Sequence, residues 1–177
     1  GKISGRHISG AILPGDTMTG EAISRVQVSS DPKFKEGDLV IAHSGWQSHP
    51  VIDVAVATKV ADREIPVSTY LGIMGMPGLT AYAGLLRLAE PKENDIVLVS
   101  AASGAVGSMV GQIAKIKNCH VVGIAGSDEK CEWVKNVAAM DNCINYKSQD
   151  LSEKIKEYCS NGIDVYFDNV GAETLQA

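Results

Sequence analysis

The residues best suited to chemistry form a glycine-punctuated run over residues 102–107. Ala102, Gly104 and Gly107 have the spacing of a dinucleotide-binding fingerprint, with alanine where the first glycine usually stands. Without a side chain at Gly104, a pyrophosphate can approach the backbone closely, and Gly107 lets a following helix pack tightly on its strand. The N-terminus of that helix offers free N–H groups and the positive end of its dipole to a phosphate. A tight strand-to-helix turn that binds nothing would carry the same glycines, so this run alone leaves both interpretations open.

The segments around the run are those that such a turn requires. Residues 96–99 are continuously apolar, which is typical of a parallel strand buried on both faces. After the turn, one apolar helical stripe is formed by Val106, Met109, Val110 and Ile113. Further along the chain, strands expected at 121–125, 143–146 and 165–168 alternate with helices expected at 129–137 and 151–158. This alternation predicts an α/β fold with a parallel sheet and right-handed crossovers.

The first third of the chain has a different pattern. Residues 1–18 show no sustained periodicity and are expected to be a loop. A first strand, with a bulge or bend, is expected within residues 20–30. A second strand is expected directly after a turn at Gly37 that needs a positive φ, and a third over residues 51–60. These segments predict a small antiparallel β unit.

A change of composition marks a domain boundary near residue 68. Helical spacing begins after it, over residues 71–89, and Pro77 stands where a helix could begin because its missing N–H costs little there. We therefore expect one domain over residues 1–68 and a second over 69–177.

Charge and composition exclude several classes of function. The 16 basic and 21 acidic residues leave a net charge of −5, without the basic stripe that binds nucleic acid. No apolar run approaches the length of a membrane span. We expect a cytoplasmic protein with no nucleic-acid and no membrane partner.

Metal chemistry is not expected either. The cysteines are scattered without a Cys-x-x-Cys pair, and the histidines show no ligand spacing. The loop over residues 43–49 contains two histidines, a serine and a tryptophan but no acidic partner at useful spacing, so we interpret it as a polar loop. We therefore predict no metal site.

Cofactor preference depends on the residues after the second strand of the α/β region. An acidic residue about 20 positions past the fingerprint holds the ribose 2′-hydroxyl of NAD, whereas a basic residue accommodates the 2′-phosphate of NADP. Here the strand tip is small and neutral, and Asp128 competes with Lys130 for this role. The sequence leans toward NADP. If NADP binds, Asp128 should point away from the site, for example at its own helix N-terminus.

Several segments together resemble the zinc-independent branch of the medium-chain dehydrogenase/reductases, and in particular its prostaglandin reductase, leukotriene hydroxydehydrogenase and curcumin reductase group. They occur in the family's order, and their sequences are GMPGLTAY at 75–82, AASGAVG at 101–107, GQIAK at 111–115, SDEK at 127–130, NYK at 145–147 and YFDNVG at 166–171.

This resemblance implies a fold and an activity. The fold would be a truncated Rossmann-type NADP-binding domain preceded by part of a GroES-like, β-rich catalytic domain. The activity would be hydride transfer from NADPH to the β-carbon of an α,β-unsaturated ketone or aldehyde, by an enzyme that is a homodimer when intact. A quinone oxidoreductase and a non-catalytic NADP-binding protein stay open as alternatives.

The resemblance also implies a set of cofactor-binding residues: Thr80, Gly104, Ala105, Val106, Gly107, Ala125, Lys130, Tyr146 and Asn169. Residues 104–107 would hold the pyrophosphate, Lys130 and Tyr146 the 2′-phosphate, and Asn169 the nicotinamide side. Thr80 would lie near the phosphates or the nicotinamide, with Met76 packed beside the cleft. The structural alternatives are a half-buried core tyrosine at 146 and a solvated helix lysine at 130.

No residue of the chain is nominated as catalytic. The resemblance implies that a tyrosine or a cofactor hydroxyl lies nearest the substrate oxygen, and that the family's tyrosine-bearing segments lie outside residues 1–177. The chain starts without a methionine and stops just after a helix begins. We expect an internal fragment of a longer subunit, which by itself would be a poor enzyme.

Overall fold

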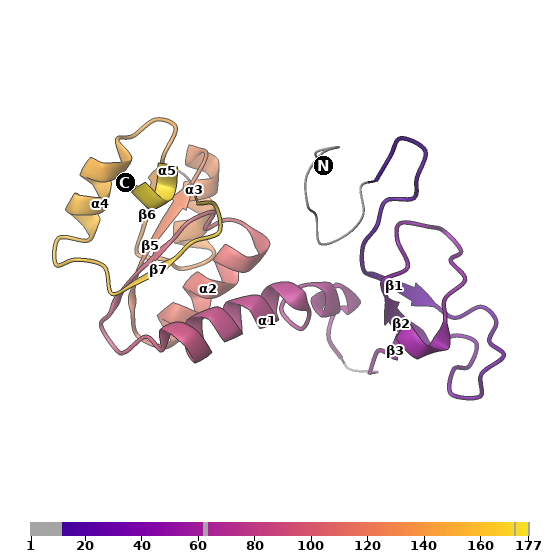
Figure 1. Cartoon of the computed structure of the whole chain (residues 1–177). Coiled ribbons are helices and arrows are strands. Elements are labelled where there is room, and N and C mark those ends of the chain that lie inside the picture. The colour runs from indigo at the N-terminus through magenta and orange to yellow at the C-terminus, as the bar shows by residue number, and fades with distance from the viewer. Residues whose placement is uncertain (1–11, 62–63, 172, 177) are drawn as a thin grey trace. The chain divides into compact units, whose positions relative to one another are not determined.

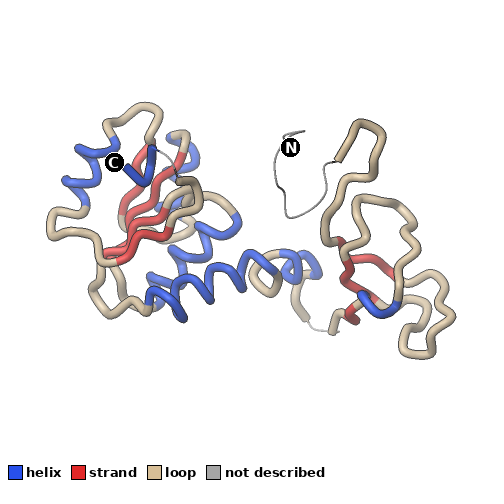
Figure 2. Tube along the Cα trace, in the orientation of Figure 1, coloured by secondary structure: helices blue, strands red, loops and turns tan. Residues whose placement is uncertain are grey.

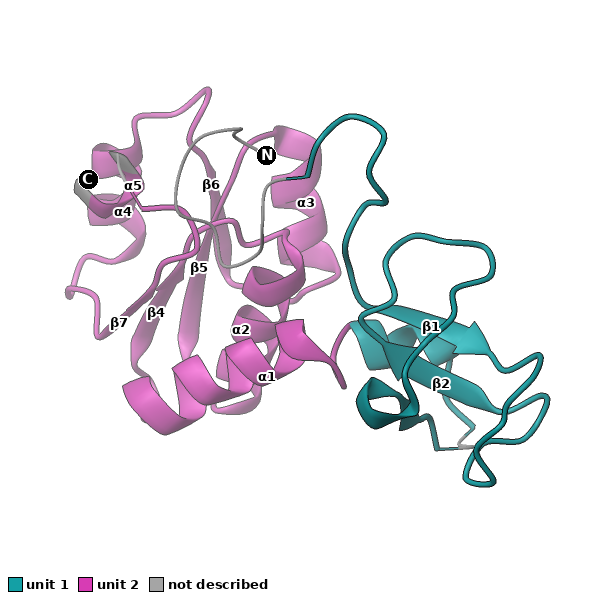
Figure 3. Cartoon of the chain, turned by 45° about the vertical axis from the view of Figure 1, so that its right-hand side comes forward, with its two compact units in different colours: residues 1–71 teal, residues 72–177 magenta. Residues whose placement is uncertain are grey.

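The computed structural model describes residues 12–61, 64–171 and 173–176, and it divides the chain into two compact units, residues 1–71 and 72–177 (Figure 3). Residues 1–11 of the expected N-terminal loop lie outside the described residues, and 12–18 contain neither helix nor strand. The assignment of a catalytic domain to 1–68 and of a nucleotide-binding domain to 69–177 stays a prediction.

Unit 1 contains a three-stranded antiparallel sheet in the order β1-β2-β3. The strands are β1 (Ala22–Arg25), β2 (Leu39–Ala42) and β3 (Thr58–Lys59), joined by the 3₁₀ helix η1 (Val54–Val56) and followed by η2 (Val67–Leu71). The first strand is shorter than expected, because it ends at Arg25 and a bend follows at Gln27. Gly37 has a φ of 88°, as the predicted turn requires.

The strand expected over residues 51–60 is wrong for most of its length. Only Thr58–Lys59 pairs with β2, and Val54–Val56 forms a 3₁₀ turn instead. The Asp53 carboxylate accepts a hydrogen bond from the Ala55 N–H at 2.9 Å and so caps this turn. Such local bonds between a side chain and the backbone compete with a strand ladder, and a valine-rich pattern does not reveal them.

Unit 2 is built on a four-stranded, wholly parallel sheet (Figures 1 and 2). Its strands are β4 (Ile96–Val99), β5 (His120–Ala125), β6 (Asn142–Asn145) and β7 (Val165–Phe167), in the order β6-β5-β4-β7. The predicted α/β class with a parallel sheet is confirmed. The order reverses direction between β4 and β7, which makes the gap between these two strands the topological switch point, where such sheets bind ligands.

Helices cover both faces of this sheet. They are α1 (Met76–Tyr82), continued by the π-helical η3 (Ala83–Ala89), α2 (Ala105–Ile116), α3 (Asp128–Asn136), α4 (Leu151–Tyr158) and α5 (Glu173–Gln176). One buried cluster joins α1, η3, α2 and α3 to Val97 and Val99, while a second joins α4 to Leu98. Side chains therefore alternate between the two faces of β4, and this explains why the whole strand is apolar.

The ends of the helices follow local signals. Pro77 lies in the first turn of α1, as expected. Ser127 caps α3, because its side chain accepts a hydrogen bond from the Lys130 N–H at 3.3 Å. The predicted strand 143–146 begins and ends one residue earlier, so that Tyr146 lies just beyond β6.

Candidate cofactor site

A groove of about 650 Å³ lies at the carboxyl ends of the strands of unit 2. Its walls come from the turn after β4, the end of β5, the first turn of α3, the residues after β6 and the residues after β7. It therefore spans the topological switch point between β4 and β7. Four of the predicted cofactor residues line this groove, namely Gly104, Ala125, Lys130 and Tyr146.

The fingerprint turn forms one wall of the groove. Ala101 has a φ of 47°, an uncommon conformation for alanine, and its carbonyl accepts a hydrogen bond from the Gly104 N–H at 2.8 Å. A Cβ at Gly107 would lie 2.4 Å from the Ala101 oxygen, whereas one at Gly104 would lie 3.0 Å from it. Gly107 thus allows α2 to approach the turn closely, and Gly104 leaves bare backbone at the groove, where no side chain caps the helix.

Another part of the groove lining carries the positive charge. Lys130, Tyr146 and Lys147 line the groove, and all three are exposed. The tyrosine is 48% exposed, so it is not a core residue. Gly126, the residue after β5, lies against Tyr146 and Lys147, since a Cβ there would be 3.2 Å from the Tyr146 hydroxyl and 3.5 Å from the Lys147 Cε. Two ammonium groups and a phenol are the donors that suit a phosphate.

Asp128, the acidic competitor for the ribose, does not line the groove. Its carboxylate accepts a hydrogen bond from the side-chain amide of Asn145 at 2.6 Å. The carboxylate is therefore engaged by a neighbouring strand end, where we had expected its own helix N-terminus.

The loop after β7 is anchored at Ser100 and Asp168. One oxygen of Asp168 accepts hydrogen bonds from the Gly171 and Val170 N–H groups, both at 3.0 Å, and from the Ser100 hydroxyl at 2.8 Å. The bonds from Gly171, Val170 and Ser100 lower the pKa of Asp168 to about 2. Asn169 is fixed as well, because its side-chain amide donates to the Ser100 carbonyl at 2.9 Å. This network positions Val170 and Gly171, which line the groove.

The other predicted cofactor residues lie outside the groove lining. These are Thr80, Ala105, Val106, Gly107 and Asn169. The Thr80 hydroxyl donates to the Met76 carbonyl at 2.8 Å and lies 3.3 Å from the Met76 Sδ. Val106 packs on the core, and Gly107 is buried.

Lys147 and Gly126 are among the lining residues that sequence reasoning missed. Lys147 stands beside Tyr146 in a segment that carried the family resemblance, so its charge was an available signal. For Gly126, the sequence indicated only that the second strand of the α/β region ends in small, neutral residues. That it lies against the tyrosine follows from the pairing of β5 with β6, which a local pattern does not show.

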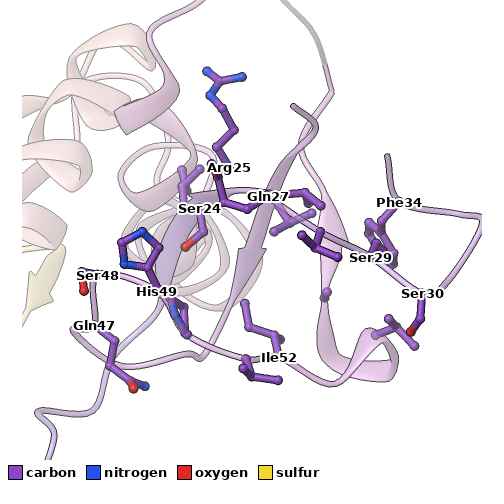
Figure 4. A pocket seen from close by; sticks show the side chains of 18 residues that line it. Ser24, Arg25, Gln27, Ser29, Ser30, Phe34, Gln47, Ser48, His49 and Ile52 are labelled. Atoms are coloured by element: carbon purple, nitrogen blue, oxygen red, sulfur yellow. The ribbon is translucent and has the colours of Figure 1, made fainter. Parts of the chain in front are cut away.

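Unit 1 has a hollow of its own, of about 760 Å³ (Figure 4). Side chains of β1 and of the loop around His49 line it, and they include no acidic residue. The Arg25 guanidinium donates to the Gly37 carbonyl at 2.7 Å. The described lining of the hollow therefore offers no carboxylate as a general acid or base.

The described part of the chain offers neither a membrane-spanning helix nor a metal site. None of its helices is long and apolar enough to cross a bilayer. Its His, Cys, Asp and Glu side chains form no group of three or more that could hold a metal ion. The cysteines are buried free thiols, and Cys131 and Cys143 lie 3.1 Å apart at their sulfurs. Burial raises the pKa of the Cys143 thiol, which disfavours the thiolate that a metal requires.

Comparison with known proteins assigns the family. A family model described as the N-terminal domain of oxidoreductase matches residues 7–60, and one described as zinc-binding dehydrogenase matches residues 105–177. The 2-alkenal reductase (NADP(+)-dependent) of Nicotiana tabacum is 47% identical over 178 residues, covering 99% of this chain and 52% of that protein. The chain belongs to the medium-chain dehydrogenase/reductase family.

Two further relatives place this medium-chain dehydrogenase/reductase in the predicted group. Prostaglandin reductase 1 of Oryctolagus cuniculus is 49% identical over 163 residues, covering 90% of this chain and 46% of that protein. The crystal structure of CurA in complex with NADPH from Vibrio vulnificus is 41% identical with a TM-score of 0.88, covering 97% of this chain and 51% of that one. The chain spans about half the length of the relatives that it matches.

Proposed function

We propose that the groove at the carboxyl ends of β4–β7 binds NADPH, and that the protein reduces the carbon–carbon double bond of α,β-unsaturated ketones or aldehydes. One observation carries the proposal: bare backbone at a helix N-terminus lines the same groove as two lysines and a phenol. The bare backbone suits a pyrophosphate, and the lysines and the phenol suit an additional phosphate. The names of the relatives, which include an NADP-dependent alkenal reductase, support the same chemistry.

The predicted cofactor residues each have a role in this proposal. Gly104 allows the pyrophosphate to approach the first turn of α2, where Ala105, Val106 and Gly107 contribute backbone N–H groups. Lys130 and Tyr146 hold the 2′-phosphate, the first as a point charge and the second as a hydrogen-bond donor.

The remaining contacts are assigned to three more residues. Ala125 lies at the end of β5 and lines the groove beside the adenosine part of the cofactor. Asn169, which is held by a hydrogen bond to Ser100, contacts the nicotinamide side of the cofactor. Thr80 lies near the phosphates or the nicotinamide. Bound NADPH supplies the hydride for the β-carbon of the substrate.

The finer features of the protein are part of the proposal. They are a zinc-independent reaction, a cytoplasmic location and a homodimer, which the resemblance implies. Buried, scattered cysteines support the first of these, since they are poor metal ligands. Sedimentation or light scattering tests the dimer.

Substrate turnover tests the proposed function. NADPH oxidation by the full-length protein is followed with an enone, an enal and a quinone, and NADPH binding is measured separately. Oxidation with the enone and enal is expected. Turnover of the quinone alone would favour a quinone oxidoreductase, and binding without any oxidation would identify a non-catalytic NADP-binding protein.

A further inference from the structure

A buried amide lies next to the part of the groove lining that is formed by Lys130, Tyr146 and Lys147. Asn145, the last residue of β6, is only 6% exposed. Its side-chain amide donates to the Asp128 carboxylate at 2.6 Å, and its side-chain oxygen accepts the Lys147 N–H at 3.2 Å. Both ends of the amide are used, and this fixes its orientation.

The same residue shapes this part of the lining. The Asn145 N–H donates to the Gln149 side-chain oxygen at 2.8 Å, and the Tyr146 N–H donates to the Ala125 carbonyl at 3.2 Å. These bonds set the course of the chain just after β6, where Tyr146 and Lys147 enter the groove. The Asn145 side chain therefore links the start of α3 to the chain just after β6, because it donates to the Asp128 carboxylate and accepts from the backbone N–H of Lys147.

Asp128 is the group that would oppose a 2′-phosphate. It is two residues before Lys130 in the first turn of α3, yet Lys130 lines the groove and Asp128 does not. A carboxylate turned into the groove would repel a phosphate and would accept hydrogen bonds from the two hydroxyls of an unphosphorylated ribose. The difference between the two arrangements is the bond to Asn145.

We propose that Asn145 is a positioning residue for cofactor choice: it holds the Asp128 carboxylate out of the groove and so keeps this part of the lining favourable for NADPH over NADH. This inference rests on the proposed NADPH site. A purely structural role for the same hydrogen bond would predict a loss of stability, with no change in the ratio of the two affinities.

A double-mutant cycle separates these roles. Dissociation constants for NADPH and NADH are measured for the wild type, Asn145→Ala, Asp128→Asn and the double variant, and thermal unfolding is recorded for each. Asn145→Ala should lower the preference for NADPH about tenfold, because the freed carboxylate repels the phosphate. Asp128→Asn keeps an acceptor for Asn145 and should leave the preference within about twofold. The double variant should regain the preference, since no carboxylate remains to be released.

A matched control is Asn142→Ala, which removes an amide from the opposite end of the same strand and should leave the preference unchanged. An unchanged preference in Asn145→Ala overturns the inference, as does a loss that Asp128→Asn does not restore. If Asn145→Ala fails to fold, Asp128→Asn alone decides. A clear gain of NADPH affinity in Asp128→Asn overturns the inference, because the Asp128 carboxylate would then already face the groove in the wild type. An unaltered preference for NADPH in Asp128→Asn supports the inference. A wild type without preference for NADPH would instead refute the proposed site, and the inference would fall with it.

Discussion

The two ends of the parallel sheet in unit 2 use aspartates in opposite ways. At the amino end, Asp141 accepts hydrogen bonds from the Lys115 ammonium at 2.8 Å and from the Val121 N–H at 2.6 Å. At the carboxyl end, neutral donors form hydrogen bonds to Asp128 and Asp168, while Lys130 and Lys147 line the groove. Charges cancel at the first end and stay available at the second. The comparison predicts that the amino end stabilises the fold and that the carboxyl end binds the ligand.

The largest expected effect is the loss of NADPH affinity in Lys130→Ala. Charge-assisted hydrogen bonds contribute about 1.5–3 kcal/mol, so we expect affinity for NADPH to fall by roughly ten- to 150-fold. NADH affinity should hardly change, because NADH has no 2′-phosphate. Titration calorimetry with both cofactors measures this. Equal losses for the two cofactors would contradict the role of the lysine.

Lys135→Ala is the matched control for that measurement. This lysine lies on the same helix but forms an ion pair with Glu132 at 2.6 Å and does not line the groove. Its replacement removes the same charge from α3 and should leave both affinities nearly unchanged. If it weakened NADPH binding as much as Lys130→Ala, long-range charge would explain the effect.

The second effect belongs to the amino end. Asp141→Ala removes the partner of Lys115 and leaves the buried Val121 N–H unsatisfied, which should lower the free energy of unfolding by about 1–3 kcal/mol. Urea denaturation measures the loss, and the ratio of NADPH to NADH affinity should not change. A changed ratio with unchanged stability would reverse the comparison of the two ends.

Protonation of Asp141 in acid should also lower the free energy of unfolding. Partial burial acts to raise its pKa, but hydrogen bonds from Lys115 and Val121 outweigh burial and hold the pKa below its usual value. The stabilisation is therefore complete above the unfolded pKa of about 3.9 and is lost as the pH falls below it.

A third, smaller effect concerns the cap of α3. Ser127→Ala removes the acceptor of the Lys130 N–H and should cost about 1 kcal/mol of stability, as measured by thermal or urea unfolding. Ser127→Asp is the informative companion, since aspartate also caps a helix but adds a negative charge beside the groove. It should keep the stability and weaken NADPH binding. Weaker NADPH binding in Ser127→Ala alone would mean that the cap positions Lys130.

The parts of this architecture that could be predicted have local causes. The spacing of Gly104 and Gly107 reflects close approaches of the turn, and Pro77 and Ser127 mark helix starts through their own backbone and side-chain chemistry. The alternation of strands and helices was sufficient for the fold class of unit 2. Each of these signals lies within a few residues of the structure that it specifies.

The parts that could not be predicted depend on contacts between distant segments or on competing local bonds. The link between Asn145 and Asp128 joins residues 17 positions apart on a strand end and a helix start. Its existence follows from the pairing of β5 and β6, which no periodicity reports. At Asp53, one side-chain hydrogen bond replaced an expected strand by a 3₁₀ turn, because it stabilises a conformation that the valines alone do not favour.

The smallest expected effect is the acid response of Asp168. Its folded pKa of about 2 lies below the unfolded value of about 3.9, so its charged form stabilises the loop after β7 fully above that value. The stabilisation is lost as the pH falls from about 4 toward 2, and it stays small because solvent screens the exposed carboxylate. Asp168→Asn keeps an acceptor oxygen but cannot titrate, so its stability should lack this component in urea denaturation across that interval. Parallel pH profiles for the two proteins would mean that the loop is held by Ser100 and its neighbours without the charge, and that Asp168 is not the anchor of the carboxyl end.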